Sequence, residues 1–183
     1  QVRARLGYGE EPLIVCAVGG TAAGAPLLEL CGDAYPLLRE ELPNLRMVIV
    51  CGPRISPDSV RAPAGVEVHG YVDRLYEHFA ASDLAIVQGG GTTTLELTAL
   101  RRPFLYFPLE EHFEQQHTVA NRLARHGAGV RMQFSTTTPS SLAAEVLAHL
   151  GTTVDYPAIP ANGARRAADV LSGMLERRAA GQA

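Results

Sequence analysis

The chain is short of cysteine, of excess charge and of long apolar runs. Its three cysteines, Cys16, Cys31 and Cys51, form no C-x-x-C pair, and the six histidines show no spacing that would complete a metal site. We therefore expect no metal and buried, reduced thiols, as in a reducing cytoplasm. The net charge of −3 gives no broad attraction for nucleic acid or an anionic membrane. No apolar run approaches the roughly 20 residues that span a bilayer.

The N-terminus lacks both a methionine and the apolar core of a signal peptide, since the chain begins QVRAR. This start reads like the middle of a longer protein. At 183 residues with 46% apolar content, the chain is long enough for one domain with a sizeable core. We expect a single domain over residues 1–183, with a linker from a missing N-terminal domain at 1–12 and a C-terminal helix and tail at 157–183.

Short apolar runs alternate with helical patterns along the chain. The expected strands are Leu13–Val18, Arg46–Cys51, Val66–His69, Leu84–Val87, Pro103–Phe107 and Val130–Met132. The expected helices are Leu27–Leu42, Asp73–Ala81 with Asp73 as its cap, Thr93–Leu100, Glu114–His126, Pro139–Leu150 and one from Asn162 or Gly163 to Arg178. Runs that are apolar on both faces favour parallel strands covered by helices. The predicted fold is α/β, a Rossmann-like doubly wound parallel sheet of about six strands with helices on both faces.

Ligands of doubly wound sheets bind beyond the carboxyl ends of the strands. Four connectors fall at that edge, and every chemically interesting stretch of the sequence belongs to one of them. They are Gly19–Gly24, Gly70–Asp73, Gly89–Thr94 and Pro108–Gln116. We expect these connectors to converge on one ligand site.

The stretch DLAIVQGGGTTTLE, Asp83 to Glu96, reads as a strand, a glycine turn and a helix N-terminus. Free backbone N–H groups and the positive end of the helix dipole favour an anion there. Glycine costs roughly 0.5–1 kcal/mol relative to alanine where no special backbone is needed, so three in a row favour a phosphate site over an ordinary turn. Glu96 has two interpretations: it completes a capping box with Thr93, or it accepts hydrogen bonds from a cis-diol beside the phosphate.

Two further stretches carry less specific signals. Gly19–Gly24 matches neither a Walker A loop nor G-x-G-x-x-G, and is either a tight turn or a loop lying against a phosphate or sugar. Glu110–His117 is either a solvated helix start or a set of amides and carboxylates that bind sugar hydroxyls. His112 and His117 lack the partner residue that a general base would need.

The string QGGGTTTLELTALRRPFLYFP, followed by EQQ and RLARHGAG, resembles the C-terminal, donor-binding domain of GT-B fold glycosyltransferases. It is similar to the peptidoglycan-precursor N-acetylglucosaminyltransferase and UDP-glycosyltransferase families, from Leu13 to about Gly129. The resemblance implies one half of a GT-B fold. It also implies a hexosyltransferase whose donor is a nucleoside-diphosphate sugar, UDP-linked, with no cofactor beyond that donor substrate.

The resemblance also implies roles for individual positions. The loop with Gly19, Gly20 and Thr21 would face the donor phosphates, and the backbone of Tyr71 and Val72 would pair with the base edge. The pyrophosphate would lie against Gly90, Gly91, Thr92, Thr93 and Thr94, the ribose against Glu96, and the sugar or ribose against Glu114, Gln115 and Gln116. Gln88 stands where many members have a phosphate-pairing histidine, and Val119 where the family often has asparagine. The tryptophan that stacks on the base in plant members is absent.

A GT-B enzyme has two Rossmann-like domains, and the acceptor and general base usually belong to the N-terminal one. We therefore expect this domain to bind the donor, and transfer to need a separate N-terminal domain or subunit that holds the catalytic residues. Two alternatives stay open: a nucleotide-sugar epimerase or hydrolase domain of the same architecture, and a non-catalytic nucleotide-binding partner. We expect a cytoplasmic protein with no transmembrane segment, in which any membrane association comes through the missing domain. The sugar, the acceptor, the pathway and the oligomeric state stay open.

Overall fold

The structure, a computed structural model, describes residues 1–180. Six parallel strands form one sheet in the order β3-β2-β1-β4-β5-β6. Their bounds are β1 Leu13–Ala17, β2 Arg46–Val50, β3 Val66–His69, β4 Leu84–Gln88, β5 Phe104–Phe107 and β6 Val130–Arg131. Every expected strand is present and ends within one residue of its prediction. The strand order reverses between β1 and β4, which is the point where doubly wound sheets bind ligands.

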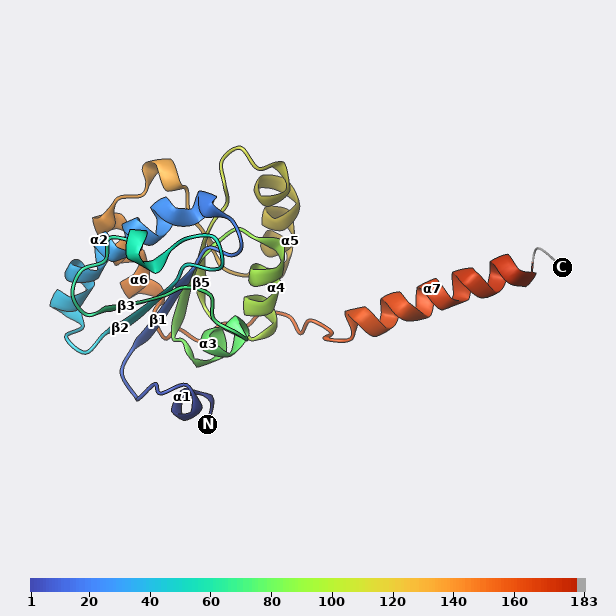
Figure 1. Cartoon of the computed structure of the whole chain (residues 1–183), viewed down its shortest axis with the longest axis horizontal. Coiled ribbons are helices and arrows are strands. Elements are labelled where there is room, and N and C mark those ends of the chain that lie inside the picture. The colour runs from blue at the N-terminus through green and yellow to red at the C-terminus, as the bar shows by residue number, and fades with distance from the viewer. Residues whose placement is uncertain (181–183) are drawn as a thin grey trace.

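Helices cover both faces of the sheet, as predicted (Figure 1). Helices α2 (Ala25–Glu41) and α6 (Pro139–His149) pack on one face, and α3 (Leu75–Ala81), α4 (Gly91–Ala99) and α5 (Ala120–His126) pack on the other. Alternate residues of β1 serve the two cores: Ile14 and Cys16 lie under α2, whereas Val15 lies under α3 and α4. Because both faces are buried, strands such as β1, β2 and β4 are apolar along most of their length, and this made them predictable from the sequence.

Four helix starts differ from the prediction. Helix α2 begins at Ala25, two residues before the expected Leu27. Helix α3 begins at Leu75 behind Arg74, which has a left-handed backbone with φ of 55°, so the expected Asp73 cap is wrong. Helix α4 begins at Gly91 with Gly90 as its N-cap, two residues earlier than expected. The helix expected from Glu114 opens instead as a π-helix, η3 (Glu114–Val119), which continues into α5. Short 3₁₀ turns at η1 (Ala22–Gly24), η2 (Pro57–Ser59) and η4 (Phe134–Thr136) were not expected.

The first residues are held against the domain where we expected a linker. Val2–Arg5 form α1, and the Arg3 guanidinium donates to the Ala81 carbonyl at 2.8 Å and pairs with Asp83 at 2.6 Å. The Asp83 carboxylate also accepts from the Leu13 N–H, so this cluster ties α1 to the start of β1. It lies at the amino ends of the strands, away from the expected ligand edge.

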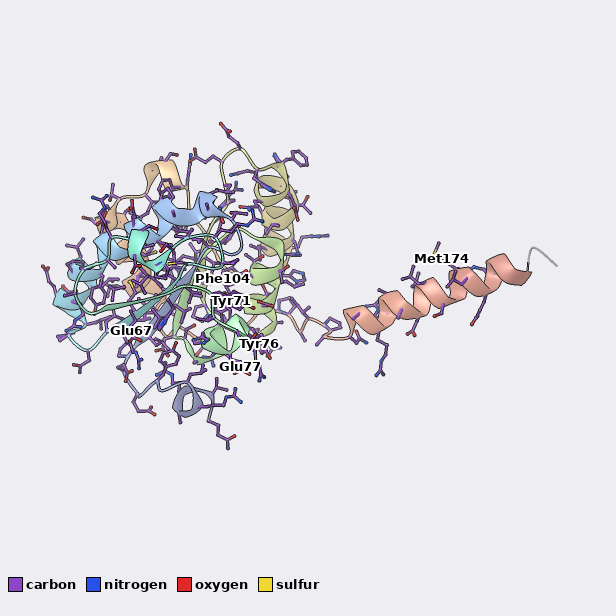
Figure 2. The ribbon with its side chains drawn as sticks, viewed as in Figure 1. Glu67, Tyr71, Tyr76, Glu77, Phe104 and Met174 are labelled. Atoms are coloured by element: carbon purple, nitrogen blue, oxygen red, sulfur yellow. The ribbon has the colours of Figure 1, made fainter. Side chains whose placement is uncertain are left out.

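The C-terminal helix α7 (Gly163–Ala180) extends away from the body of the domain (Figure 1). Its apolar side chains are exposed, including Met174, which is labelled in Figure 2. Residues 181–183 of the expected tail lie outside the described residues. Among residues 1–180, no helix combines the length and apolar composition that crossing a bilayer demands.

Candidate functional site

The carboxyl ends of the strands carry a row of cavities rather than one continuous pocket. The largest, of about 480 Å³, lies over β1, β2 and β3. It is lined by Ala17, Gly19, Gly20, Val50, Gly52, Pro53, the run from Tyr71 to Tyr76, and Glu96. Of the four connectors expected to converge, two line this cavity, namely the loops after β1 and β3, and they meet Glu96 in the second turn of α4. Gly52 and Pro53, from the loop after β2, were not expected in the site.

The three glycines after β4 have different functions in the fold. A Cβ on Gly89 would lie 2.8 Å from the Pro108 Cα, so Gly89 is required by close packing against the end of β5. Above Gly90 there is open space, since a Cβ there would meet nothing within 4 Å. The Gly90 backbone, with φ of −69° and ψ of 141°, is one that any residue adopts. Folding therefore does not explain the glycine at position 90, whereas close approach of a ligand would.

Helix α4 leaves its first N–H groups open. The earliest helical bond runs from the Thr94 N–H to the Gly90 carbonyl at 3.1 Å. In the described part of the chain, the N–H groups of Gly91, Thr92 and Thr93 have no protein acceptor, and no side chain caps the helix. Three free donors at the positive end of a helix dipole, beneath the open space at Gly90, form an arrangement that suits an anion.

Thr94 differs from its two neighbours. Its side chain is buried, and its hydroxyl donates to the Gly90 carbonyl at 2.8 Å while accepting from Arg122 at 3.0 Å. Arg122 also donates to the Gly91 carbonyl. Because α4 starts at Gly91, Thr94 sits one turn inside the helix and faces the protein. The expectation that Thr94 contacts the ligand is corrected: it positions the loop from behind.

The structure excludes the capping-box interpretation of Glu96. Thr93 lies inside α4 and is not its N-cap, so the capping box is wrong. The Glu96 side chain instead lines the 480 Å³ cavity, opposite Gly19 and Tyr71. Burial raises the pKa of its carboxyl above the ordinary value. Among the side chains of residues 1–177, which the structure describes, the Glu96 carboxylate has no ion-pair or hydrogen-bond partner, so its acceptor capacity is available to a ligand.

Two tyrosines and an arginine form the outer wall of the same cavity. Tyr71 is 70% exposed, and Tyr76 is the second residue of α3 (Figure 2). The Arg74 guanidinium lies 5.6 Å from the Tyr76 ring centre, donates to the Tyr76 hydroxyl at 2.9 Å and pairs with Glu77. Sequence reasoning missed Arg74 and Tyr76. The aromatic residues that flank the connector in YVDRLY were the available signal.

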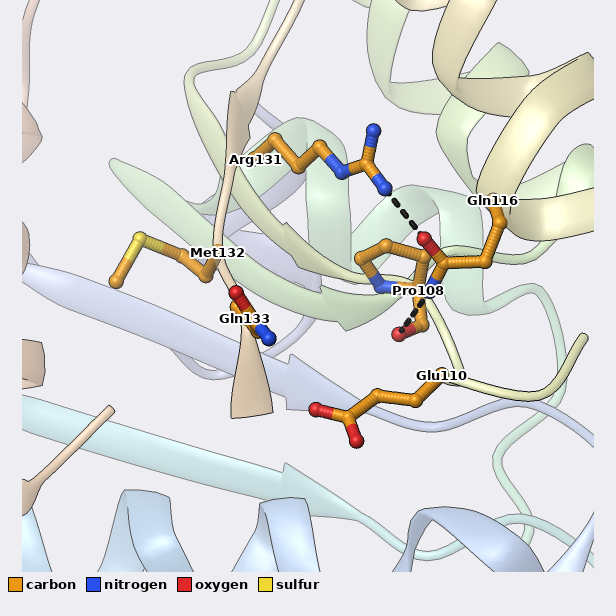
Figure 3. A pocket seen from close by; sticks show the side chains of 6 residues that line it. All are labelled: Pro108, Glu110, Gln116, Arg131, Met132 and Gln133. Atoms are coloured by element: carbon orange, nitrogen blue, oxygen red, sulfur yellow. Dashed lines mark hydrogen bonds between the residues drawn. The ribbon is translucent and has the colours of Figure 1, made fainter. Parts of the chain in front are cut away.

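The two glutamines expected to contact the sugar brace the loop after β5. Gln115 accepts from the Leu109 N–H at 2.8 Å, and Gln116 donates to the Leu109 carbonyl at 2.9 Å. Gln116 also accepts from Arg131 across a second cavity, of about 440 Å³ (Figure 3). Both ends of its amide are thus engaged within the protein, which leaves a ligand the second acceptor position of the Gln116 Oε1.

That second cavity is polar and open, between the loop after β5 and strand β6. Its walls are Pro108, Glu110, Gln116, Arg131, Met132 and Gln133 (Figure 3). Hydrogen bonds from the Ser135 side chain and from the Ser135 N–H, the latter at 3.2 Å, lower the pKa of the Glu110 carboxyl. Glu114, the third residue expected in this region, is exposed, and its carboxylate approaches Gly91.

A third, smaller cavity of about 160 Å³ separates these two. Gln88, at the end of β4, lies in its wall and is only 6% exposed. Its Nε2 is buried without a hydrogen-bond partner. Thr21, by contrast, is exposed in the loop after β1 and lines none of the three cavities.

Neither a metal centre nor a nucleophile–base pair emerges from the described side chains. No group of three His, Cys, Asp or Glu in the part of the chain that the structure describes could hold an ion. His117 stacks on Phe113, with 4.6 Å between ring centres, and both are exposed. The arrangement can bind a ligand with an anionic centre and polar groups on either side.

Comparison with known proteins places this arrangement in a family. The model of the glycosyltransferase family 28 C-terminal domain matches residues 14–170. Two relatives are named UDP-N-acetylglucosamine–N-acetylmuramyl-(pentapeptide) pyrophosphoryl-undecaprenol N-acetylglucosamine transferase. The one from Acidiphilium cryptum is 34% identical over 91% of this chain and 49% of its own length. The one from Carboxydothermus hydrogenoformans is 28% identical over 80% of this chain and 41% of its own length.

Solved structures agree with these sequence relatives. The crystal structure of Acinetobacter baumannii MurG is 25% identical, with a TM-score of 0.60 over 80% of this chain and 44% of that one. The glycosyltransferase of kitacinnamycin shares the fold, with a TM-score of 0.61 at 23% identity over 76% of this chain and 35% of that one. The chain spans about half the length of the curated relatives it matches. It belongs to the glycosyltransferase family 28 C-terminal domain family, and is a GT-B type glycosyltransferase domain.

Proposed function

We propose that this domain binds the nucleoside-diphosphate sugar donor, UDP-linked, of a glycosyl transfer reaction. The observation that carries the proposal is the row of features along the sheet edge. An unpaired carboxylate lines the large cavity, three unpaired N–H groups lie beside it, and a smaller cavity follows. A nucleoside, a diphosphate and a sugar are joined in that order in such a donor.

The nucleoside would occupy the 480 Å³ cavity. Glu96 would accept hydrogen bonds from the ribose hydroxyls, which replace the water that burial removes. The backbone of Tyr71 and Val72 would pair with the edge of the base. Gly19 and Gly20 offer backbone without side chains on the facing wall, where a Cβ at either position would meet nothing within 4 Å.

The diphosphate would lie over Gly90 and accept from the N–H groups of Gly91, Thr92 and Thr93. As the glycosyl bond breaks, charge grows on the leaving nucleoside diphosphate. Preorganised N–H donors and the helix dipole would stabilise that charge, and loss of one such donor costs about 3 kcal/mol in comparable sites. In this proposal no cofactor and no metal ion takes part.

Transfer would require more than this domain. The relatives from Acidiphilium cryptum and Carboxydothermus hydrogenoformans are named for transfer of N-acetylglucosamine from a UDP-linked donor, and the chain spans about half of each. The acceptor and the general base would belong to an N-terminal domain or a partner subunit. The three cysteines are free and buried, which accords with the cytoplasmic setting that we propose.

Isothermal titration calorimetry of the full 183-residue chain with UDP tests the proposal. We expect one UDP to bind per chain, and uridine without phosphates to bind much more weakly. A folded chain that gives no heat with UDP, and no shift in melting temperature, would contradict donor binding.

A further inference from the structure

Glu77 is a buried carboxylate that joins two separate parts of the chain. It lies in the first turn of α3 and is only 8% exposed (Figure 2). One of its oxygens pairs with Arg5 of α1 at 2.7 Å, and the other pairs with Arg74, the residue that precedes α3. A buried charge is costly unless it is paired, so the two arginines stabilise Glu77 in this position. The carboxylate thereby links the N-terminal helix to the connector after β3.

The connector end of this link lies in the wall of the 480 Å³ cavity. Arg74 lines that cavity, and its left-handed backbone, with φ of 55°, is one that residues other than glycine seldom adopt. Its guanidinium is held on two sides, because Nε donates to the Tyr76 hydroxyl at 2.9 Å and Nη2 pairs with Glu77. Among the side chains that the structure describes, no group accepts from Arg74 Nη1, so its two N–H groups are available to a ligand.

The two oxygens of Glu77 are divided between the two arginines. While Arg5 occupies Oε2, Arg74 pairs with Oε1 through Nη2, and its Nη1 group stays free. Without Arg5, both oxygens would be open to Arg74, and a guanidinium favours pairing with a carboxylate through two parallel hydrogen bonds. The second bond would occupy Nη1 and draw Arg74 toward α3. Arg5 therefore decides which donors Arg74 presents to the cavity, although Arg5 does not line it.

We propose that Arg74 binds the nucleoside end of the donor, and that Glu77 and Arg5 are positioning residues that hold Arg74 in its binding arrangement. This step rests on the proposed function, in which the nucleoside occupies the cavity that Arg74 lines. The free Nη1 group donates to an acceptor oxygen of the nucleoside, while Glu77 and Tyr76 hold the rest of the guanidinium. Because coupling between two sites is reciprocal, bound UDP strengthens the docking of α1 on α3 in return.

Calorimetric titration of UDP into variants of the full chain tests this coupling. Arg74→Asn removes the guanidinium and introduces a residue that tolerates a left-handed backbone, and it should weaken UDP binding by about tenfold or more. Arg5→Ala should weaken UDP binding by about three- to fivefold, as expected for an ion pair with one partly exposed partner. Arg5→Lys should restore most of the affinity, because an ammonium group can still occupy one oxygen of Glu77.

The double variant distinguishes positioning from a general effect on the fold. In the Arg74→Asn background, Arg5→Ala should change UDP affinity by no more than about twofold, because no guanidinium remains to be repositioned. Arg61→Ala is the matched control, since Arg61 forms an exposed ion pair with Glu29 and does not line the cavity. It should leave UDP affinity at the wild-type value in both backgrounds.

The outcomes separate this inference from the proposed function. If UDP does not bind the wild-type chain, both fail together. If UDP binds the wild type and a folded Arg5→Ala variant with equal affinity, the positioning inference alone fails. It also fails if Arg5→Ala weakens UDP binding equally with and without Arg74, because α1 would then act on the site by another route. Should Arg5→Ala not fold, Arg5→Gln removes the charge and keeps most of the side chain, and the same affinities decide.

Discussion

The open space above Gly90 gives a direct way to separate ligand binding from folding. In Gly90→Val the new side chain meets no protein atom within 4 Å at its Cβ, and valine is at ease at φ of −69° and ψ of 141°. Replacing glycine where the backbone allows it stabilises a chain by about 0.4–1 kcal/mol, because the unfolded state loses freedom. This gain is offset by the loss of glycine at the N-cap of α4, a position that disfavours valine, so the melting temperature should stay close to that of wild type.

Binding should respond in the opposite direction. A valine at position 90 would hold the diphosphate away from the free N–H groups that follow it in α4. Each charge-assisted hydrogen bond contributes about 1.5–3 kcal/mol, so losing two of them weakens UDP binding by roughly 100-fold or more. Calorimetry with UDP and a thermal melt of the same preparation measure both effects.

Gly163→Val is the matched control, since Gly163 also has open space around it and lies at the start of α7. It should leave UDP affinity at the wild-type value. Wild-type affinity in Gly90→Val would refute the assignment of this loop to the diphosphate. A sharp fall in its melting temperature would show instead that position 90 is glycine for structural reasons.

Three further predictions follow from other parts of the fold. Glu96→Gln should weaken UDP binding by about tenfold through loss of a charged acceptor for the ribose. Because burial raises the pKa of Glu96 in the folded chain, its ionisation opposes folding as pH rises above about 4.5, so the same variant should melt higher than wild type at pH 7. Burial lowers the pKa of His78, which bonds to Tyr8 at 2.6 Å. His78 therefore binds a proton less readily in the folded state than in the unfolded state, and the free energy of unfolding should fall as pH drops below about 6.5. Urea titrations at pH 7.5 and 5.5 should show a smaller loss of unfolding free energy between the two pH values for His78→Gln than for the wild type. Gln116→Ala removes the hydrogen bonds that join Arg131 to the loop after β5, and should lower the free energy of unfolding in urea by about 1–3 kcal/mol. An unchanged free energy of unfolding would show that these hydrogen bonds do not stabilise the fold.

Strands β1, β2 and β4 were predictable because a parallel sheet covered on both faces buries nearly every position in its inner strands. LIVCA, RMVIV and LAIVQ each bury every residue or all but the first, and each stood out in the sequence for that reason. The terminal polar residue of the third run, Gln88, was read as a loop residue. Its side chain is as buried as its neighbours, which only the packing of α2 against that face reveals.

The site was harder to predict where helix-capping preferences and ligand binding favour different residues. Threonine is a favoured N-cap, so TTTLE placed the helix start at Thr93 and gave Glu96 a capping role. The helix instead starts at Gly91 with no side-chain cap, a locally poor choice that leaves its donors open for a ligand. Gln116 and Arg131 are fifteen residues apart, and no spacing rule predicts the hydrogen bond between them.

The charges around the proposed diphosphate position, at Gly90 and the first N–H groups of α4, affect how tightly the departing nucleoside diphosphate would be held. The chain contains no lysine, and three arginines at this edge of the sheet already have partners: Arg122 on the Gly91 carbonyl, Arg131 on Gln116 and Arg74 on Glu77. Glu96 and Glu114 add negative charge on either side of the loop. A diphosphate would therefore contact uncharged N–H groups and a helix dipole, while the charge of Arg122 behind the loop offsets part of the repulsion from Glu96 and Glu114. These N–H donors stabilise charge only on the phosphate oxygens that they contact, as in the transition state of transfer. They would hold the departing nucleoside diphosphate less tightly than a cluster of cations would.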